Sequence, residues 1–302
     1  MKKNKKIDTS TFRHLYPFKS HYMEINGLNY HFLDEGRGDP VVMIHGNPTW
    51  SFYYRNLVQG LSEQFRTVVP DHMGCGLSDT PDVHGYDYRL KSRVDDLENL
   101  LHHLGIDKNI TLVLHDWGGM IGMAYALRYP ETIRRFVIMN TAAFLPPKGK
   151  TLPMRLRVIR NIEPFATLAI LGFNLFARSA LFTAPHKKLP KDVKSGLIAP
   201  YNSWKNRIAT LKFVQDIPVK EADPSYRLVR YVDDNLYKLR HIPMLICWGD
   251  HDFVFDSDYR LEWQRRFPDA SVKTFSGAGH YVLEDKPDEI LCLVKEFLKY
   301  QN

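Results

Sequence analysis

A carboxylate stands at the end of an apolar run in the stretch LVLHDWGGM, residues 112–120. The run is typical of a buried strand, and the Trp-Gly-Gly that follows Asp116 is typical of a tight turn into a helix. Such a turn exposes one side chain above the sheet and beside a helix N-terminus, where a carboxylate could attack a carbon atom and form an ester. We therefore predict that Asp116 is a nucleophile. The match to the serine-bearing form of this turn is incomplete, because Leu114 stands where that form has Gly.

Two more polar residues follow later strands and complete a triad with Asp116. His280 lies in GAGHYVLED after the last predicted strand, and Asp252 lies in CWGDHD after the strand before it. The Gly-x-x-Asp spacing from Gly249 favours Asp252 over Asp250 as the acid that orients the histidine. The order nucleophile, acid, histidine is that of a known catalytic triad. An Asp before a helix is by itself usually an N-cap, but the joint arrangement at strand ends favours catalysis.

A site for a developing negative charge is predicted beside this triad. Asn47, in HGNP, follows an earlier predicted strand, and its backbone N–H would pair with that of Trp117. Nothing else in the sequence predicts a cofactor or metal. GCGLSD (74–79) is not a dinucleotide fingerprint, and the adjacent His102 and His103 lie on different helix faces.

The elements that must position these residues alternate between strands and helices. Asn26-Gly27 predicts a hairpin. Strands are predicted at 41–46, 66–71, 109–116, 135–140, 243–250 and 271–277, with helices at 51–63, 88–104, from Trp117 onward and at the C-terminus. Strands separated by helix-length segments indicate an α/β fold with a mostly parallel sheet and helices on both faces. Ligands bind outside the carboxyl ends of such strands, where the predicted triad lies.

The segment 146–236 interrupts this alternation, because it holds no strand-like run. We predict a helical cap here, between core segments 15–145 and 237–302. Within it, residues 164–182 are apolar almost all round, but Asn174 and Arg178 leave the apolar stretch too short for a membrane span. We expect a buried or cavity-facing helix that forms the ceiling of an apolar pocket.

Composition and charge are those of an ordinary globular protein, with 44% hydrophobic and 25% charged residues and a net charge of +7. Residues 1–14 begin with MKKNKK and are predicted to be a flexible basic tail with at most weak attraction to a membrane surface. No apolar stretch of a secretory signal follows it. The dispersed basic residues do not predict nucleic-acid binding. Three unevenly spaced cysteines, Cys75, Cys247 and Cys292, favour reduced thiols in a cytoplasmic protein.

Several of these segments carry a resemblance to a known family. The chain resembles the haloalkane dehalogenase branch of the α/β-hydrolases in four segments, HGNPTWSFYYRNL, DHMGCGLSD, LVLHDWGGMIG and GAGHYVLED. Three further segments resemble the third subfamily of that branch, namely NTAAFLPPKGK, SWKNRIATLKFVQDIP and LICWGDHDFVFD. That subfamily includes the β-lactone decarboxylases of bacterial long-chain olefin biosynthesis. The likeness covers about residues 15–300. It implies the α/β-hydrolase fold with an inserted helical cap.

The resemblance also implies roles for individual residues. The side-chain N–H groups of Asn47 and Trp117 match the pair that holds the leaving halide in dehalogenases. Asn140 stands where some dehalogenases carry Glu, which supports Asp252 as the acid. The resemblance favours decarboxylation of a long-chain cis-β-lactone to a cis-alkene and CO2, since the lactone's tethered carboxylate is another leaving anion. It also implies that the chain could assemble with other enzymes of olefin biosynthesis.

Three alternatives stay open. Haloalkane hydrolysis would use the same residues, with water activated by His280 releasing the alcohol from an alkyl-aspartate ester. An epoxide hydrolase would need two cap tyrosines as acids, for which Tyr201, Tyr226, Tyr231 and Tyr237 are available. A non-catalytic ligand-binding protein could use the same fold, although it would need no nucleophile.

Overall fold

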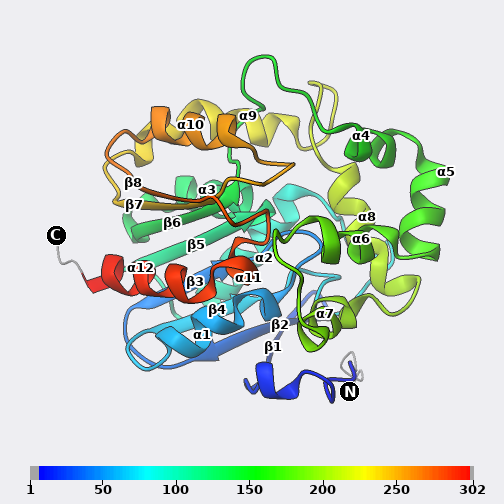
Figure 1. The fold of residues 1–302 in the computed structure, drawn as a ribbon, viewed down its shortest axis with the longest axis horizontal. Coiled ribbons are helices and arrows are strands. Elements are labelled where there is room, and N and C mark those ends of the chain that lie inside the picture. Colours follow the sequence, from blue (N-terminus) through cyan, green and yellow to red (C-terminus); the bar gives the residue numbers. More distant parts are fainter. Residues whose placement is uncertain (1–6, 300–302) are drawn as a thin grey trace.

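An eight-stranded sheet forms the centre of the computed structural model, which describes residues 7–299 (Figure 1). Its spatial order is β1-β2-β4-β3-β5-β6-β7-β8. The strands are β1 (His21–Ile25), β2 (Leu28–Glu35), β3 (Pro40–Ile44), β4 (Arg66–Pro70), β5 (Ile110–Asp116), β6 (Ile133–Thr141), β7 (Met244–Gly249) and β8 (Ser271–Phe275). The predicted hairpin at Asn26-Gly27 joins β1 to β2. β2 pairs antiparallel with both β1 and β4, and every pairing from β4 to β8 is parallel, which confirms the predicted mostly parallel sheet.

Helices cover both faces of this sheet, as the sequence predicts. The α-helices are α1 (Arg55–Leu61), α2 (Leu90–His103), α3 (Trp117–Arg128), α4 (Met154–Asn161), α5 (Glu163–Ala166), α6 (Leu175–Thr183), α7 (Lys191–Ile198), α8 (Ile208–Gln215), α9 (Tyr226–Asn235), α10 (Ser257–Arg266), α11 (Val282–Asp285) and α12 (Pro287–Lys299). A π-helical segment, η4 (Thr167–Gly172), lies between α5 and α6. Short 3-10 turns are η1 (Arg13–Leu15), η2 (Ser51–Tyr54), η3 (Pro130–Thr132), η5 (Ala199–Tyr201), η6 (Lys205–Arg207) and η7 (Leu236–Leu239).

The alternation of side chains along β5 divides the core into two layers. Leu112 and Leu114 pack with α2, α3, α9 and α10 on one face of the sheet. Val113 packs on the other face with α1 and α12. Successive strand residues point to opposite faces, so an uninterrupted apolar run is what a strand buried on both sides requires. The burial holds β5 in place, and with it the residue at its end.

The predicted cap helix over 164–182 is not one helix. The chain forms α5, η4 and α6, and the axis bends by 74° between Gly172 and Leu175. Asn174 adopts a left-handed conformation with φ of 56°, which Asn tolerates better than most residues and which ends a helix. The prediction of a buried helix is also wrong in part, because Phe165 and Phe173 are largely exposed. Figure 1 shows α4 to α8 gathered at one end of the sheet.

Two regions differ from the predicted division of the chain. Helix α9, which falls inside the predicted cap, packs on α3 and contributes Val229 and Val232 to the core. In the predicted tail, residues 1–6 lie outside the described residues, whereas Phe12 is fully buried against Trp50. An aromatic ring in a basic segment gives that segment apolar area to bury, which a charge count does not register.

Candidate active site

The backbone at Asp116 is held in an unusual conformation at the end of β5. Asp116 has φ of 50° and is the N-cap of α3, as the predicted turn requires. The turn depends on glycine, because a Cβ at Gly118 would lie 1.9 Å from the carbonyl oxygen of Ile44. The hydroxyl of Thr141 donates a hydrogen bond to the Asp116 carbonyl. These contacts fix the nucleophile candidate above the sheet edge.

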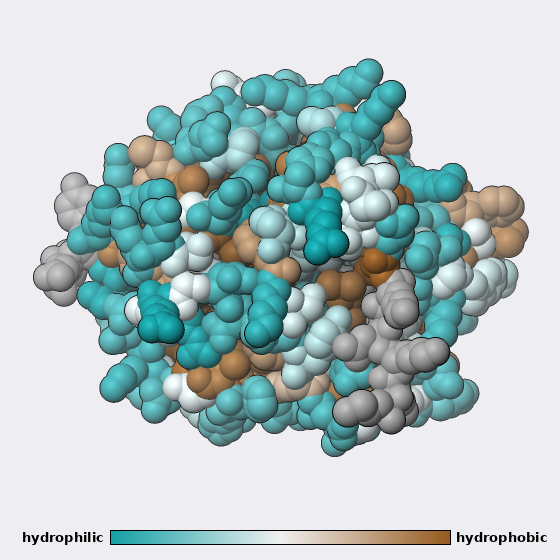
Figure 2. Space-filling view, turned by 90° about the horizontal axis from the view of Figure 1, so that it is seen from below, coloured by the Kyte–Doolittle hydropathy of each residue, from teal (hydrophilic) through white to brown (hydrophobic). Residues whose placement is uncertain are grey.

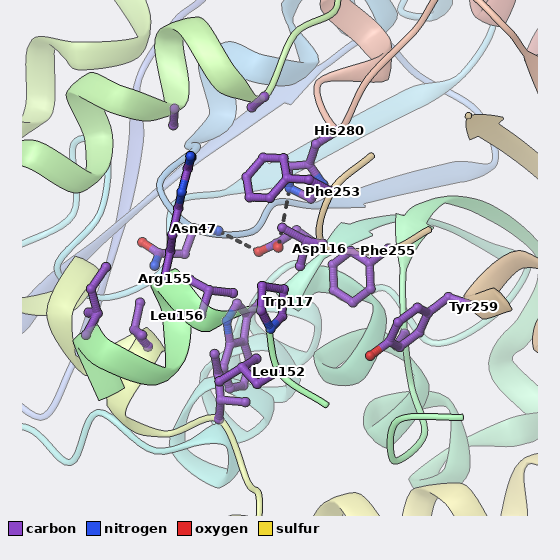
Figure 3. Close-up of a pocket in the computed structure, with 18 of the residues that line it drawn as sticks. Asn47, Asp116, Trp117, Leu152, Arg155, Leu156, Phe253, Phe255, Tyr259 and His280 are labelled. Atoms are coloured by element: carbon purple, nitrogen blue, oxygen red, sulfur yellow. Dashed lines mark hydrogen bonds and ion pairs between the residues drawn. The ribbon is translucent and has the colours of Figure 1, made fainter. Parts of the chain in front are cut away.

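The Asp116 carboxylate has a different partner on each oxygen (Figure 3). Its Oδ1 accepts a hydrogen bond of 2.8 Å from the backbone N–H of Asn47, and its Oδ2 lies 3.5 Å from Nε2 of His280. Burial by itself would raise the pKa of Asp116, but the hydrogen bond and charge of His280 outweigh it and lower the pKa below its usual value. The group is therefore ionised at neutral pH, as a nucleophile must be.

His280 is oriented by Asp252. Nδ1 of His280 lies 2.7 Å from Oδ2 of Asp252, whose Oδ1 accepts backbone N–H groups from Val254 at 2.7 Å and Phe255 at 3.1 Å. Asn140 donates to the same Oδ2 at 3.0 Å and accepts the Gly249 N–H at 2.8 Å. The structure therefore brings Asp116, His280 and Asp252 together, whereas the side chain of Asp250 is exposed.

The charge state of His280 follows from these neighbours. Burial by itself would lower the pKa of His280, but the Asp252 charge and the contacts with both carboxylates raise it to about 10. His115, directly before the nucleophile, contacts the carbonyl oxygen of His280 through Nε2 at 2.8 Å, and burial lowers the pKa of His115 to about 3. His115 is thus neutral, and it ties the loop that carries a protonated His280 to β5.

Asn47 and Trp117 both line the cavity above Asp116. The Asn47 amide donates to the carbonyl of Thr210 in α8 at 3.1 Å, which couples the side chain to the cap. The Trp117 ring packs on Phe213 of the same helix, with ring centroids 5.3 Å apart. The predicted pair of donors lies together, but in this structure the Asn47 backbone N–H holds the nucleophile itself.

An apolar cavity of about 260 Å³ opens above the triad. Core strand ends and the cap both line it, and most of the lining is apolar. Its polar members besides Asn47, Asp116, Trp117 and His280 are Arg155, Ser179, Thr183, Tyr259 and Tyr281. Tyr201, Tyr226, Tyr231 and Tyr237, the tyrosines considered for an epoxide hydrolase, do not line it. Residues 7–299 contain no group of three or more His, Cys, Asp and Glu side chains placed to hold a metal ion.

Several residues of the site carry no signal in the sequence. The hydroxyl of Thr141, the carbonyl of Thr210 and the ring of His115 act through contacts that only the fold creates. Thr210 lies 163 residues from Asn47 in the chain, and no spacing rule connects the two. Of these three residues, His115 alone has a position in the sequence, one residue before the nucleophile, that indicates a place in the site.

Comparison with known proteins places this geometry in a family. A family model for the alpha/beta hydrolase fold matches residues 39–287. The cis-3-alkyl-4-alkyloxetan-2-one decarboxylase of Shewanella oneidensis is 51% identical, over 94% of this chain and 89% of that protein. Haloalkane dehalogenase 2 of Mycobacterium tuberculosis is 32% identical, over 96% and 98% of the two chains.

Solved structures agree on the fold. The crystal structure of haloalkane dehalogenase DbeA from Bradyrhizobium elkani superposes with a TM-score of 0.84 at 24% identity, covering 93% of this chain and 97% of that one. The resemblance to the dehalogenase branch, with the oxetanone decarboxylases as nearer relatives than the dehalogenases, is confirmed. The chain belongs to the alpha/beta hydrolase fold family.

Proposed function

We propose that this protein is a cis-3-alkyl-4-alkyloxetan-2-one decarboxylase, which converts a long-chain cis-β-lactone to a cis-alkene and CO2. The relative at 51% identity carries that name. The single structural observation that carries the proposal is an ionised carboxylate, Asp116, in the lining of an apolar cavity that Asn47 and Trp117 also line. Such a lining suits attack on a strained ring whose leaving group is an anion.

In the first step, Oδ2 of Asp116 attacks the ring carbon C4 with inversion. The C4–O bond of the lactone breaks, and its electron pair stays on the oxygen, which becomes part of a free carboxylate. The side-chain N–H groups of Asn47 and Trp117 are the donors proposed to receive this anion, with Asn47 using the amide hydrogen that does not bond Thr210. Because Oδ1 already accepts the Asn47 N–H, the carboxylate is oriented with Oδ2 toward the cavity.

In the second step, the ester is eliminated. The bond from C3 to the carboxylate carbon breaks and releases CO2, and its electron pair forms the C3–C4 double bond. The C4–O bond to Asp116 breaks, and its pair returns to the aspartate. Inversion leaves the two departing groups anti, so a cis-lactone gives a cis-alkene. Protonated His280, next to Oδ2, stabilises the aspartate as it leaves, and no water is consumed.

The test is a side-by-side assay with a long-chain cis-β-lactone and a 1-haloalkane, using Asp116→Ala as the control. We expect alkene from the lactone with the unchanged protein and none with the variant. A single turnover in oxygen-18 water then separates the two points of attack. Attack at the carbonyl would form a mixed anhydride, and label in Asp116 or in CO2 above background exchange would contradict the route above.

Haloalkane hydrolysis is the second candidate function. The observation that favours it is that Asn47 and Trp117 both line the cavity with Asp116, where a halide would leave. Halide release without alkene would make this the function of the chain. Cytoplasmic localisation and assembly with other olefin-biosynthesis enzymes stay predictions.

A further inference from the structure

Large apolar side chains are exposed together on the cap. We call them the apolar cap surface; they are 51–69% exposed and comprise Phe165, Leu168, Phe173, Leu175 and Phe182. They come from α5, η4, the bend that follows and α6. Figure 2 shows hydrophobic residues at the edge of the molecule where α5 lies in Figure 1. Single exposed apolar residues are ordinary on protein surfaces. A group of them on consecutive helices instead indicates a surface that binds a protein, a membrane or a ligand.

The bend at Asn174 places these residues on the outside of the cap. Leu175, Arg178 and Phe182 follow one another at the helical spacing i, i+3 and i+7, so they share one exposed face of α6. Before the bend, a Cβ added at Gly172 would contact both Leu168 and the exposed Trp204, so these two side chains lie close together. No single helix among residues 7–299 is long and apolar enough to cross a membrane, and α5–η4 with α6 reaches that length only as a pair bent by 74°.

Positive charge accompanies the apolar cap surface. Residues 146–236 hold 16 Lys and Arg and 7 Asp and Glu, a net charge of +9, whereas the whole chain carries +7. On α4, Arg160 pairs with Asp223 at 2.5 Å, but Arg157 forms no ion pair with another described residue. Arg178 is equally without a carboxylate partner among residues 7–299, and the Lys194 ammonium lies 4.2 Å from the ring centre of Phe182. Cations are thus free at the border of the apolar residues.

Helix α6, which carries part of the apolar cap surface, also lines the cavity. Helices α4 and α6 line it through Leu156, Phe176 and Ser179, and the Ser179 side chain is also exposed. The helix that presents Leu175 and Phe182 outward therefore presents its neighbouring face to the cavity. A molecule bound to the apolar cap surface would lie against a helix that also lines the cavity.

We propose that the apolar cap surface binds a lipid bilayer with anionic headgroups. The apolar side chains insert at the boundary of headgroups and acyl chains, and Arg157, Arg178 and Lys194 pair with phosphates. Free cations around apolar side chains fit a negatively charged lipid surface, whereas an apolar protein partner would leave them unpaired. An apolar substrate dissolved in the bilayer would then enter the cavity from the membrane side.

The experiment is vesicle co-sedimentation of the full-length protein without substrate, so the outcome does not depend on the proposed function. Vesicles are phosphatidylcholine alone or an equal mixture with phosphatidylglycerol. We expect binding to the mixture that high salt weakens. Phe165→Ser with Phe173→Ser should lower the partition coefficient about tenfold or more, and Arg157→Gln with Arg178→Gln about fivefold for each charge.

Matched controls lie on the core. Leu261→Ser with Tyr237→Ser removes equally exposed apolar residues elsewhere, and Lys108→Gln with Lys273→Gln removes exposed charges. Both should bind vesicles as the unchanged protein does. Unfolding midpoints and turnover of a short, water-soluble substrate check that each variant is folded. If the serine variant is unfolded, vesicle binding by the arginine variant alone tests the proposal.

Three outcomes would overturn the proposal. One is no binding to the mixed vesicles beyond that to phosphatidylcholine. Another is equal loss of binding in the core controls. The third is that the cap variants abolish self-association in sedimentation velocity and leave vesicle binding unchanged, which would make a second copy of this chain the occupant.

Discussion

Two turns with left-handed residues, one in the core and one in the cap, serve the cavity in different ways. Asp116 and Asn174 have φ of 50° and 56°. The turn at Asp116 is closed except toward the cavity, with its carbonyl bonded to Thr141 and a buried helix face behind it. The turn at Asn174 is held by a hydrogen bond from its side-chain amide to the carbonyl of Tyr201 at 3.0 Å and by backbone bonds with Ile170 and Arg178, and exposed apolar residues follow it.

The difference between the two turns shows where the backbone must be held in one exact position. At Asp116 the surrounding contacts over-determine the backbone, so a strained conformation can persist and hold a reacting group in one place. At Asn174 the chain needs only to change direction, so that one helix face meets the cavity and another meets solvent. The core fixes the chemistry, and the cap shapes access to it. The changes below test that division, beginning with the largest effect.

Asp116→Asn should abolish turnover. The variant keeps the shape of the side chain and can still meet the Asn47 N–H, but the amide is no nucleophile. We expect kcat/KM to fall by about 10⁴-fold or more, as for loss of other covalent nucleophiles. Steady-state kinetics with the β-lactone measures it, and binding of a non-reactive long-chain ligand should be retained. Loss of that binding as well would show that the substitution disturbs the structure of the turn and the cavity, and not only the nucleophile.

His280→Gln should lower kcat by about 10²–10³-fold, because a neutral group replaces the imidazolium beside Oδ2 of Asp116. In the proposed route the ester still forms but is eliminated slowly. Intact-protein mass spectrometry after mixing with the lactone should show a covalent adduct on the variant. Asp252→Asn, which alters only the orienting partner, should give a smaller effect. Equal turnover in the variant and the unchanged protein would exclude His280 from the mechanism.

The pH dependence should reflect the same pair of groups. Asp116 is ionised well below neutral pH because its pKa is lowered, and His280 stays protonated until its pKa of about 10. The kcat for the lactone, which includes the elimination step that His280 assists, should be flat from about pH 5 to pH 9 and fall about tenfold per unit above pH 10. The alkaline fall should be absent in His280→Gln. A rate that rises through neutral pH would instead indicate a neutral histidine acting as a base.

A structural feature can be predicted from the sequence when the contacts that determine it are between residues close together in the chain. The turn at Asp116 is predictable because a buried strand, a polar residue and two glycines are adjacent, and parallel strands bring Asn47 and His280 to the same edge. The break at Asn174 is not predictable in this way. The apolar composition of 164–182 is continuous across it, and the left-handed conformation is selected by packing against Tyr201, which lies 27 residues further on. The anchoring of Asn47 by Thr210 is likewise a product of the fold.

Asn174→Val should destabilise the cap with little effect on the core. A β-branched residue at positive φ is strained and also loses the bond to Tyr201, so we expect the free energy of unfolding to fall by about 2 kcal/mol. Asn174→Gly is the matched control, because Gly accepts this φ and loses only the hydrogen bond, which costs about 1 kcal/mol. Denaturant unfolding measures both, and hydrogen exchange should locate the change in α6 and spare β5. If the two variants were equally stable, the hydrogen bond would hold the bend and the left-handed conformation would be incidental. If β5 exchanged faster in either one, the cap and the strand that carries Asp116 would form one cooperative unit, contrary to the division drawn from the two turns.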